Sequence, residues 1–290
     1  MPKYKRNHFI SQGLIKFWQR PNGQVLLWDR RENSSLDFRN PKSVHYREYL
    51  YATWDTDGNR DMSAEHFLRS EIDDRVPELV EKIASNWPNV LPLAIEDRDF
   101  LLNLIVRTIL RHPTIPNLSK SSIEVRFASL LIRASRWLDR KNGRDAAYER
   151  YGRDRVLSSE IMSLAAKMDV EPLISQIENR QIGLFALEEG SPNLVLGTQP
   201  FLLNPHGKDT DIKAGLVIHP RILIGILAIE GDDFVGVLSK DDVYRINGLF
   251  IRQSRHLVLV NGSDIDGAWF DEYQSDGTSE RQYISVAAKE

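Results

Sequence analysis

The pattern of apolar residues changes near residue 181, and this change limits the folds that the chain can adopt. Before it, apolar residues recur at three- and four-residue spacing, as in the run that begins at Ser63, which indicates amphipathic helices. After it, short runs rich in leucine and β-branched residues are separated by Gly, Pro, Asn and Asp, which is typical of strands and turns. We therefore expect an α+β protein with an N-terminal mixed segment, a central helical layer and a C-terminal small β-sheet region.

Individual elements can be placed from periodicity and turn residues. A strand is expected at 25–29, after the turn Pro21-Asn22-Gly23, and Pro113 should end a helix because proline disfavours helical geometry in the residue before it. The expected helices lie at 63–83, 96–112, 121–139 and 158–177. The expected later strands lie at 182–187, 193–196, 216–219, 223–229 and 256–260. We expect residues 1–180 and 181–290 to form two regions that pack as one unit, which suits a chain of 290 residues.

Composition removes several functional classes. The chain has no cysteine, which excludes disulfides, thiolate zinc sites, iron–sulfur ligation and thiol nucleophiles. No apolar run approaches the ~20 residues of a membrane helix, and the start of the chain lacks the apolar stretch of a secretory signal. We therefore expect a cytoplasmic protein with no membrane partner. The motifs GxxxxGK[ST], GxGxxG and GxSxG are absent, so nucleotide-binding loops and serine hydrolases lack their main support.

Basic residues concentrate in the middle of the chain. Residues 101–160 hold 12 Lys/Arg against 6 Asp/Glu, although the whole chain carries a net charge of −3. Guanidinium groups pair with phosphate and stack on bases, so the arginine-rich stretch 126–155, beside Tyr148 and Tyr151, is typical of a nucleic-acid surface. The predicted contact residues are Arg133, Arg136 and Arg140. Interleaved acidic residues leave a second interpretation open, a solvated or partner-bound helix face.

The helix expected at 96–112 carries a polar stripe. Asp99, Asn103, Arg107 and Arg111 follow each other at four-residue intervals, so successive side chains are offset by only about 40° around the axis. Two arginines on one face repel each other, which suggests that they face an anion. Alternatively, cations near the end of the helix complement its dipole.

His112 follows the stripe and adds a group that can transfer protons. Arg107 and His112 have the Arg-x4-His spacing found in a large group of helical ribonucleases, in which arginine holds phosphate and histidine transfers protons. Helical geometry separates these two side chains by about 140° unless the helix ends earlier. No HExxH or His-x-His pair occurs, and we predict no metal ligands by position. Mg²⁺ remains a candidate cofactor if folding joins two of the carboxylate clusters, which are Asp73-Asp74, Glu96-Asp97-Asp99, Asp232-Asp233 and Asp241-Asp242.

The opening segment is Asn7-His8-Phe9-Ile10-Ser11-Gln12, followed by Leu14 and Phe17. It resembles the signature His-His-Tyr-Val-Pro-Gln…Leu…Phe of a mostly bacterial family catalogued as domain of unknown function 4238. The segment from Glu96-Asp97-Arg98 to Arg111-His112-Pro113 is similar to a family helix that ends in Arg-Thr-Pro. Gly197-Thr198-Gln199-Pro200 lies where the family tends to have Thr-Ser-Asp-x-Pro. This chain departs from the pattern at Asn7, Ser11 and Thr198.

The resemblance implies a candidate site but no reaction, because the activity of the family is not established. The residues that carry over are His8, Gln12 and Arg111, with Glu65 at the start of the first long helix. A histidine and a glutamine beside a buried arginine can bind a phosphate or carboxylate. They can equally fix the N-terminal segment to the helix, since buried polar groups need partners in either case.

These observations favour a protein that binds or cleaves nucleic acid, as an effector of a bacterial defence or toxin system. In this hypothesis the catalytic residues are His8, Arg107, Arg111 and His112. The residues that bind substrate are Gln12, Asn103, Arg133, Arg136 and Arg140. Two alternatives remain: an interaction module whose aromatic tail around Trp269 and Tyr273 docks a protein partner or a second copy, and a protein that binds an anion or nucleotide at His8, Gln12 and Arg111.

Overall fold

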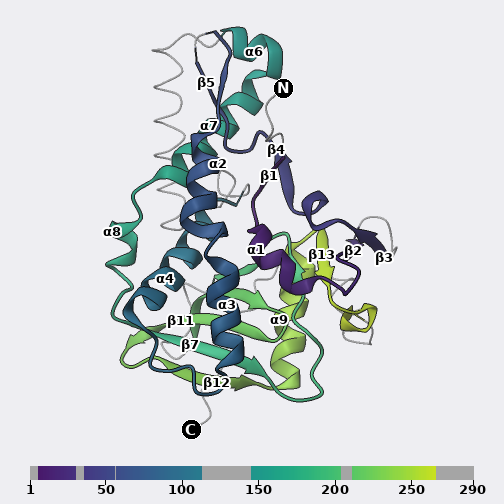
Figure 1. The fold of residues 1–290 in the computed structure, drawn as a ribbon, viewed down its shortest axis with the longest axis vertical. Coiled ribbons are helices and arrows are strands. Elements are labelled where there is room, and N and C mark those ends of the chain that lie inside the picture. Colours follow the sequence, from purple (N-terminus) through teal and green to yellow (C-terminus); the bar gives the residue numbers. More distant parts are fainter. Residues whose placement is uncertain (1–5, 31–35, 56, 113–144, 204–210, 266–290) are drawn as a thin grey trace.

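The computed structural model describes residues 6–30, 36–55, 57–112, 145–203 and 211–265 (Figure 1). The elements of the first half are β1 (Arg6–His8), α1 (Gln12–Ile15), the 3₁₀ turn η1 (Lys16–Trp18), β2 (Val25–Asp29), β3 (Leu36–Arg39), the 3₁₀ turn η3 (Pro41–Ser43), β4 (Tyr46–Glu48), β5 (Thr53–Trp54), β6 (Arg60–Asp61), α2 (Ser63–Leu68), the π-helical turn η4 (Arg69–Asp73), α3 (Val76–Ser85) and α4 (Ile95–Leu110). The later elements are α6 (Asp145–Tyr151), α7 (Arg153–Lys167), α8 (Glu171–Ile174), β7 (Arg180–Leu187), β8 (Leu196–Gly197), β9 (Phe201–Leu203), β10 (Ile212–His219), β11 (Ile222–Glu230), β12 (Phe234–Leu238), α9 (Lys240–Gln253), β13 (His256–Leu259) and the 3₁₀ turn η6 (Gly262–Ile265). The predicted α+β class is confirmed.

Two larger sheets form the base of the fold. One has the strand order β12-β7-β11-β10-β9, in which only β12 runs parallel to its neighbour, and the other has the order β3-β2-β13-β8. β2 pairs with β13 from Asp29 opposite His256 to Leu26 opposite Leu259. The two regions expected from the sequence therefore share a sheet, and one hydrophobic core runs through both.

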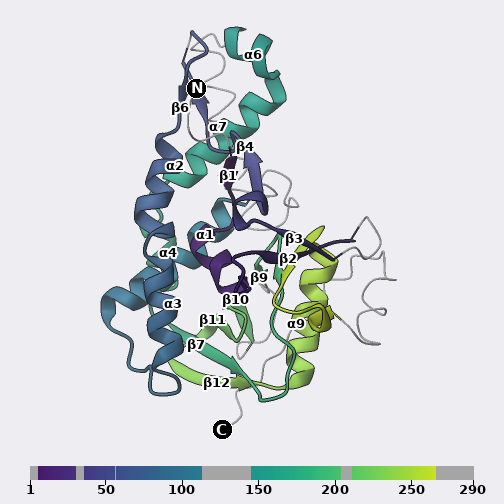
Figure 2. The same ribbon diagram turned by 45° about the vertical axis from the view of Figure 1, so that its right-hand side comes forward.

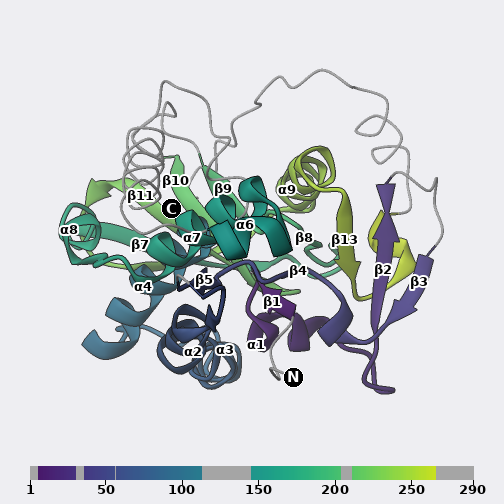
Figure 3. The ribbon, with the colours of Figure 1, turned by 90° about the horizontal axis from the view of Figure 1, so that it is seen from above.

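Helices α3 and α4 cover one face of the five-stranded sheet (Figures 1 and 3). Its central strand β11 reads Ile-Leu-Ile-Gly-Ile-Leu over its first six residues, and all six are buried. A strand with both faces covered needs such a continuous apolar run, because neither face meets water. The alternation of apolar and polar residues, typical of half-exposed strands, is accordingly missing here.

The first long helical run is interrupted. Apolar spacing predicts one helix over 63–83, but the chain forms α2, then η4, then α3. In η4 the Asp74 N–H donates to the carbonyl oxygen of Arg69, a five-residue step, and Pro77 lies in the first turn of α3. A π-helical turn adds a residue to the helix and re-aims the side chains around it, and such turns are frequent at functional sites.

Most other expected elements in the described ranges are confirmed, with shifted ends. The strand at 25–29 is β2, and the helix at 96–112 is α4, which ends before Pro113. The helix expected at 158–177 is instead α7 followed by the short α8, because Pro172 starts a new helix. Of the strand expected at 193–196, only its last residue is in β8. The helix expected at 121–139 lies outside the described residues.

Helix α9 and strand β12 were not expected, and α9 carries the chain from one sheet to the other. Its N-terminus is fixed by a capping box, in which the Asp242 N–H donates to Ser239 Oγ at 3.2 Å and the Ser239 N–H donates to Asp242 Oδ2 at 3.2 Å. The sequence Ser-Lys-Asp-Asp predicts this capping box only weakly, since a capping box usually has Glu or Gln in the last position.

We expect Ser239→Ala to lower the free energy of unfolding by about 1 kcal/mol, because the first turn of α9 loses the acceptor for a backbone N–H group. Urea unfolding followed by circular dichroism would measure the change. Ser70→Ala is a matched control, since Ser70 is exposed and its hydroxyl caps no helix. Equal stability of the two variants would contradict the role of the capping box.

No helix in the described ranges is both long and apolar enough to cross a membrane.

Candidate functional site

The guanidinium group of Arg111 lies at the centre of a buried polar cluster just beyond α4. The side chain is 1% exposed. Its Nε donates to the carbonyl oxygen of Phe9 at 3.1 Å, and its Nη1 donates to Asp73 Oδ1 at 2.9 Å. Arg111 therefore joins the end of α4 to the N-terminal segment and to η4. The predicted site residues His8 and Gln12 lie on either side of Phe9, in the same N-terminal segment.

The π-helical turn η4 supplies the carboxylate for this cation. Asp73 is the last residue of η4, and its side chain is 20% exposed. Helix α1 lies directly against the turn: a Cβ on Gly13 would approach the Asp73 carbonyl oxygen to 2.8 Å and Pro77 Cδ to 3.0 Å. Gly13 thus allows the N-terminal segment to reach the backbone of η4. The ion pair and this close approach hold three distant segments together.

His8 enters the cluster from β1. It pairs with Tyr46 in the β1–β4 ladder, and Gln12 Nε2 donates to its Nδ1 at 2.9 Å. Burial lowers the pKa of His8 to about 4, and the Arg111 charge acts in the same direction, whereas Asp73 raises it. The hydroxyl of Tyr51 lies between the carbonyl oxygens of His8, at 3.3 Å, and Arg111, at 3.1 Å. His8 is therefore a neutral hydrogen-bonding group at pH 7.

Glu65 is the titratable group of the cluster that is tuned to neutral pH. Burial raises its pKa to about 7, and the Asp73 charge adds to this, while Arg111 and the amide of Asn7 lower it. Glu65 lies in the first turn of α2 and is half-buried. A carboxyl group with this pKa exchanges its proton readily at physiological pH, which is the property required of a general acid or base.

Two buried polar groups beside Glu65 have unused hydrogen-bonding capacity. Arg111 Nη2 has no hydrogen-bond partner among the described residues, and neither polar side-chain atom of Asn7 forms a hydrogen bond of normal geometry there. Leaving such groups unpaired costs roughly 1–3 kcal/mol each. Asn7, His8, Gln12, Glu65, Asp73 and Arg111 together are called the Arg111 site below. Its spare donors and acceptor suit a polar, negatively charged ligand.

Arg107 and Asn103 point elsewhere. Arg107 Nε donates to Asn103 Oδ1 at 3.0 Å, and Arg107 Nη1 donates to the carbonyl oxygen of Ala166 in α7 at 2.7 Å. The guanidinium carbon lies 4.8 Å from the centroid of the Phe67 ring. These contacts fasten α4 to α7 and α2, so the two arginines of the polar stripe do not share one anion site.

His112 faces the sheet. Its Nε2 donates to the Thr198 carbonyl oxygen at 2.7 Å, and its ring makes edge contacts with Phe9 and Phe201. Burial lowers the pKa of His112 to about 4, although the Thr198 carbonyl opposes this. The expected Arg-x4-His pair is therefore not formed, because Arg107 contacts α7 while His112 contacts the loop after β8.

His45 is a third buried histidine beside His8 and His112. The sequence analysis did not single it out. Its carbonyl oxygen accepts from the Phe9 N–H at 3.1 Å, and its φ of 51° is in the left-handed region. Burial lowers the pKa of His45 to about 3, and His256, His8 and His112 lower it further. The ring therefore packs as a neutral group between the N-terminal segment and the sheet.

The acidic clusters predicted as possible Mg²⁺ ligands lie apart. No group of three or more His, Asp or Glu side chains in the described ranges could hold a metal ion. Asp97 pairs with Lys82, and Asp242 caps α9. Asp73 pairs with Arg111, so these three carboxylates have partners within the protein.

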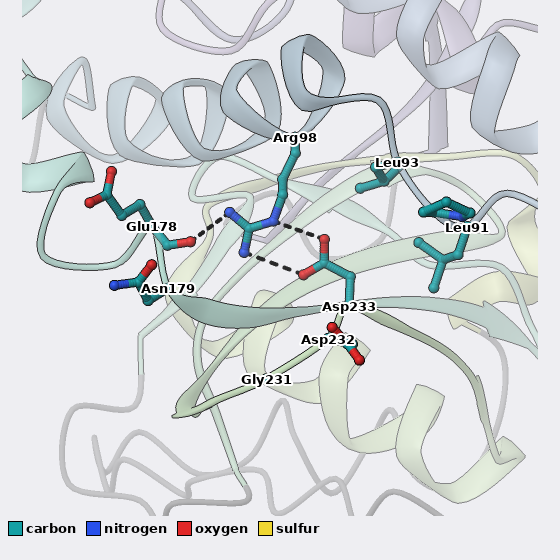
Figure 4. A pocket seen from close by; sticks show the side chains of 9 residues that line it. Leu91, Leu93, Arg98, Glu178, Asn179, Gly231, Asp232 and Asp233 are labelled. Atoms are coloured by element: carbon teal, nitrogen blue, oxygen red, sulfur yellow. Dashed lines mark hydrogen bonds and ion pairs between the residues drawn. The ribbon is translucent and has the colours of Figure 1, made fainter.

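A recess of about 590 Å³ lies at the far end of α4, near Arg98 (Figure 4). Arg98 Nε donates to Asp233 Oδ2 at 2.9 Å, and its Nη1 and Nη2 donate to the carbonyl oxygens of Glu178 and Arg180. Asp233 Oδ1 also accepts from the Ile182 N–H at 2.8 Å. These polar groups tie α4 to β7 and to the turn before β12, which leaves no free guanidinium edge for a ligand.

Five predicted residues cannot be placed. Arg133, Arg136, Arg140, Trp269 and Tyr273 lie outside the described residues. The missed members of the site, Asp73 and Asn7, carried only weak signals: Asp73 belongs to an acidic pair, and Asn7 stands where the resembled family has histidine.

The family model described as "Protein of unknown function (DUF4238)" matches residues 6–264. No curated protein and no solved structure matches the chain.

Proposed function

The chain belongs to the DUF4238 family of proteins of unknown function, and from the geometry of its Arg111 site we propose that it binds nucleic acid and cleaves RNA. One observation carries the proposal: a buried guanidinium group with an unused donor, Arg111 Nη2, lies close to a carboxyl group, Glu65, whose pKa is about 7. The first group suits a phosphate, and the second suits proton transfer.

RNA fits this set of groups because it carries its own nucleophile. In the proposed step the Glu65 carboxylate takes the proton of a ribose 2′-hydroxyl, whose oxygen attacks the adjacent phosphorus. The P–O5′ bond breaks, and the 5′-oxygen leaves with the bonding electrons and takes a proton from water. The products are a 2′,3′-cyclic phosphate and a 5′-hydroxyl. Arg111 Nη2 would stabilise the extra negative charge on the phosphoryl oxygens.

The remaining predicted residues take supporting roles. His8 is neutral and accepts a hydrogen bond from the Gln12 amide. Arg107 and His112 are bound to backbone carbonyls of α7 and of the loop after β8, and we assign them to positioning. Arg133, Arg136 and Arg140 remain candidate substrate contacts, and Mg²⁺ remains a candidate cofactor for RNA binding.

We expect Glu65→Gln to lower RNA cleavage at pH 7.5 at least 100-fold, because general-base catalysis typically contributes 10²–10⁴. Wild-type activity should rise with pH through about 7, as the carboxyl group loses its proton. Gel analysis of total RNA, transfer RNA and plasmid DNA, with magnesium or with a chelator, measures the cleavage.

Glu96→Gln in the exposed first turn of α4 is the matched control and should cleave as wild type does. An equal thermal midpoint shows that Glu65→Gln is folded. Intact RNA with the wild-type protein, or equal cleavage by both variants, would contradict the proposal. Cleavage of plasmid DNA alone would make a 2′-hydroxyl mechanism untenable.

The proposal includes an effector role against cytoplasmic RNA in a bacterial defence or toxin system. Induced expression of the wild-type protein should then arrest bacterial growth, whereas Glu65→Gln should not. Nucleotide binding detected by thermal shift without any cleavage would instead favour an anion-binding protein, which the spare donor of Arg111 also supports.

A further inference from the structure

Three arginines gather around two tyrosine rings at the end of the molecule formed by β5, β6, α6 and α7. The guanidinium carbon of Arg60 lies 4.3 Å from the centroid of the Tyr49 ring and 5.8 Å from that of Tyr151. Arg155 lies 5.4 Å from the Tyr49 centroid, and Arg150 lies 5.4 Å from the Tyr151 centroid. The two rings are 6.0 Å apart. These five residues are called the Arg–Tyr surface below.

Few carboxylates neutralise these cations. Arg155 lies 3.5 Å from Glu48 Oε2, whereas Arg60 has no carboxylate within 4 Å among the side chains that the structure describes. Asp61, next to Arg60, accepts from Ser63 and pairs with Lys167. Three guanidinium groups held this close repel one another, and a polyanion would relieve that repulsion. A guanidinium that stacks on a ring keeps its N–H edges free for phosphate.

The backbone at Tyr49 is strained in a way that serves this arrangement. Its φ of 57° is in the left-handed region, which is unusual for a bulky side chain and costs of order 1–3 kcal/mol; such strain clusters at functional sites. This conformation holds the ring between Arg60 and Arg155. Arg60 also lines a recess of about 290 Å³, together with Thr53, Trp54, Asn59 and the carboxylates of Asp55 and Asp61.

The Arg–Tyr surface lies next to the Arg111 site. Tyr46 is opposite His8 in the β1–β4 ladder, with ring centroids 6.1 Å apart. Tyr49 follows Tyr46 by three residues, so their Cα atoms are at most about 10 Å apart. In Figures 1 and 2 the β1–β4 ladder lies between α1 and the end that carries α6 and β5. A strand of a few nucleotides would reach from one to the other.

We infer that the Arg–Tyr surface binds the phosphates of RNA and leads the strand into the Arg111 site; the inference rests on the proposed RNA cleavage. Arg60 supplies a free guanidinium edge, and Arg150 and Arg155 supply two further cations beside it. The tyrosine rings hold these groups in place, so the surface reads the RNA backbone and not its sequence.

The test measures binding in the Glu65→Gln protein, which keeps the RNA intact. Fluorescence anisotropy with a labelled 12-nucleotide RNA, at several KCl concentrations, gives the affinity and its salt dependence. We expect Arg60→Gln/Arg150→Gln/Arg155→Gln to weaken binding at least tenfold at 100 mM KCl. The slope of log affinity against log salt should fall by about 2, since each phosphate contact on a single strand contributes about 0.7.

The matched control removes three exposed cations far from the surface, by Arg39→Gln/Lys240→Gln/Arg245→Gln, and should change affinity less than threefold. Equal loss of affinity in both triple variants would overturn the inference, and so would displacement of the RNA by polyglutamate as readily as by unlabelled RNA. If wild type cleaves RNA but the Arg60 triple variant binds normally, only the inference fails. If RNA binds at this surface and wild type does not cleave it, only the cleavage proposal fails.

Discussion

Asp73→Asn should lower the free energy of unfolding by about 3–5 kcal/mol, because it removes the carboxylate that pairs directly with the buried Arg111 cation. The Arg111 side chain is 1% exposed, and its Nη1 lies 2.9 Å from Asp73 Oδ1. An asparagine oxygen can accept the same hydrogen bond, so the loss of stability measures the effect of the negative charge alone. Urea unfolding at pH 7.5 and low salt would measure it.

The neighbouring acid provides the control. Asp74 is 63% exposed and pairs with exposed Arg69 at 3.5 Å, so Asp74→Asn should cost less than 1 kcal/mol. Arg111→Met combined with Asp73→Asn should regain part of the loss, since it removes the unpaired cation. A stability of Asp73→Asn equal to that of Asp74→Asn would show that the ion pair does not hold the site together.

Acid should unfold the protein steeply between about pH 6 and pH 4. Burial lowers the pKa of His8 and His112 to about 4 and that of His45 to about 3, whereas an exposed histidine has about 6.5. The unfolded chain therefore binds more protons in this window, and stability falls as the pH is lowered. Three protons correspond to roughly 4 kcal/mol per pH unit. Urea unfolding at half-unit pH steps would give the slope.

Glu65 changes the stability with pH in the direction opposite to the histidines, because its pKa is raised to about 7. Its contribution is complete below about pH 4.5 and is lost as the pH rises through 7, so it offsets part of the histidine effect. Asparagine adopts the left-handed backbone conformation readily, so His45→Asn should keep the fold. The slope of stability against pH should then correspond to about one proton fewer. His66→Asn, on the exposed face of α2, is the matched control. A slope that is the same in both variants would exclude His45 as a cause.

Local pattern was enough to predict much of the fold. The run at 25–29 and the helix that ends before Pro113 were found because turn residues mark their ends. The break at η4 could not be seen, since Leu68, Ile72 and Val76 keep helical spacing across the π turn. Helix α9 was missed because its charged residues obscure the apolar face formed by Val243, Ile246 and Phe250.

The candidate site was only partly predictable for a similar reason. His8, Gln12 and Arg111 were singled out through a family resemblance. Gln12 contacts His8, and Arg111 contacts the backbone of Phe9, the residue after His8. The stripe on α4 suggested that Arg107 and Arg111 share an anion, but tertiary contacts direct one to α7 and the other to η4. Asp73 became part of the site through the π turn, and helical periodicity carries no information on such a turn.

The pairing of β2 with β13 affects how the chain is made. Asp29 and His256 are 227 residues apart and meet through a hydrogen bond of 2.8 Å. At a synthesis rate of about 5–20 residues per second, strand β13 is made roughly 10–50 s after β2. Throughout that time the apolar edge of β2 is available to other chains. A chain released from the ribosome before β13 is made would therefore be prone to aggregation. During normal synthesis, holdase chaperones should associate with the nascent chain until translation reaches β13.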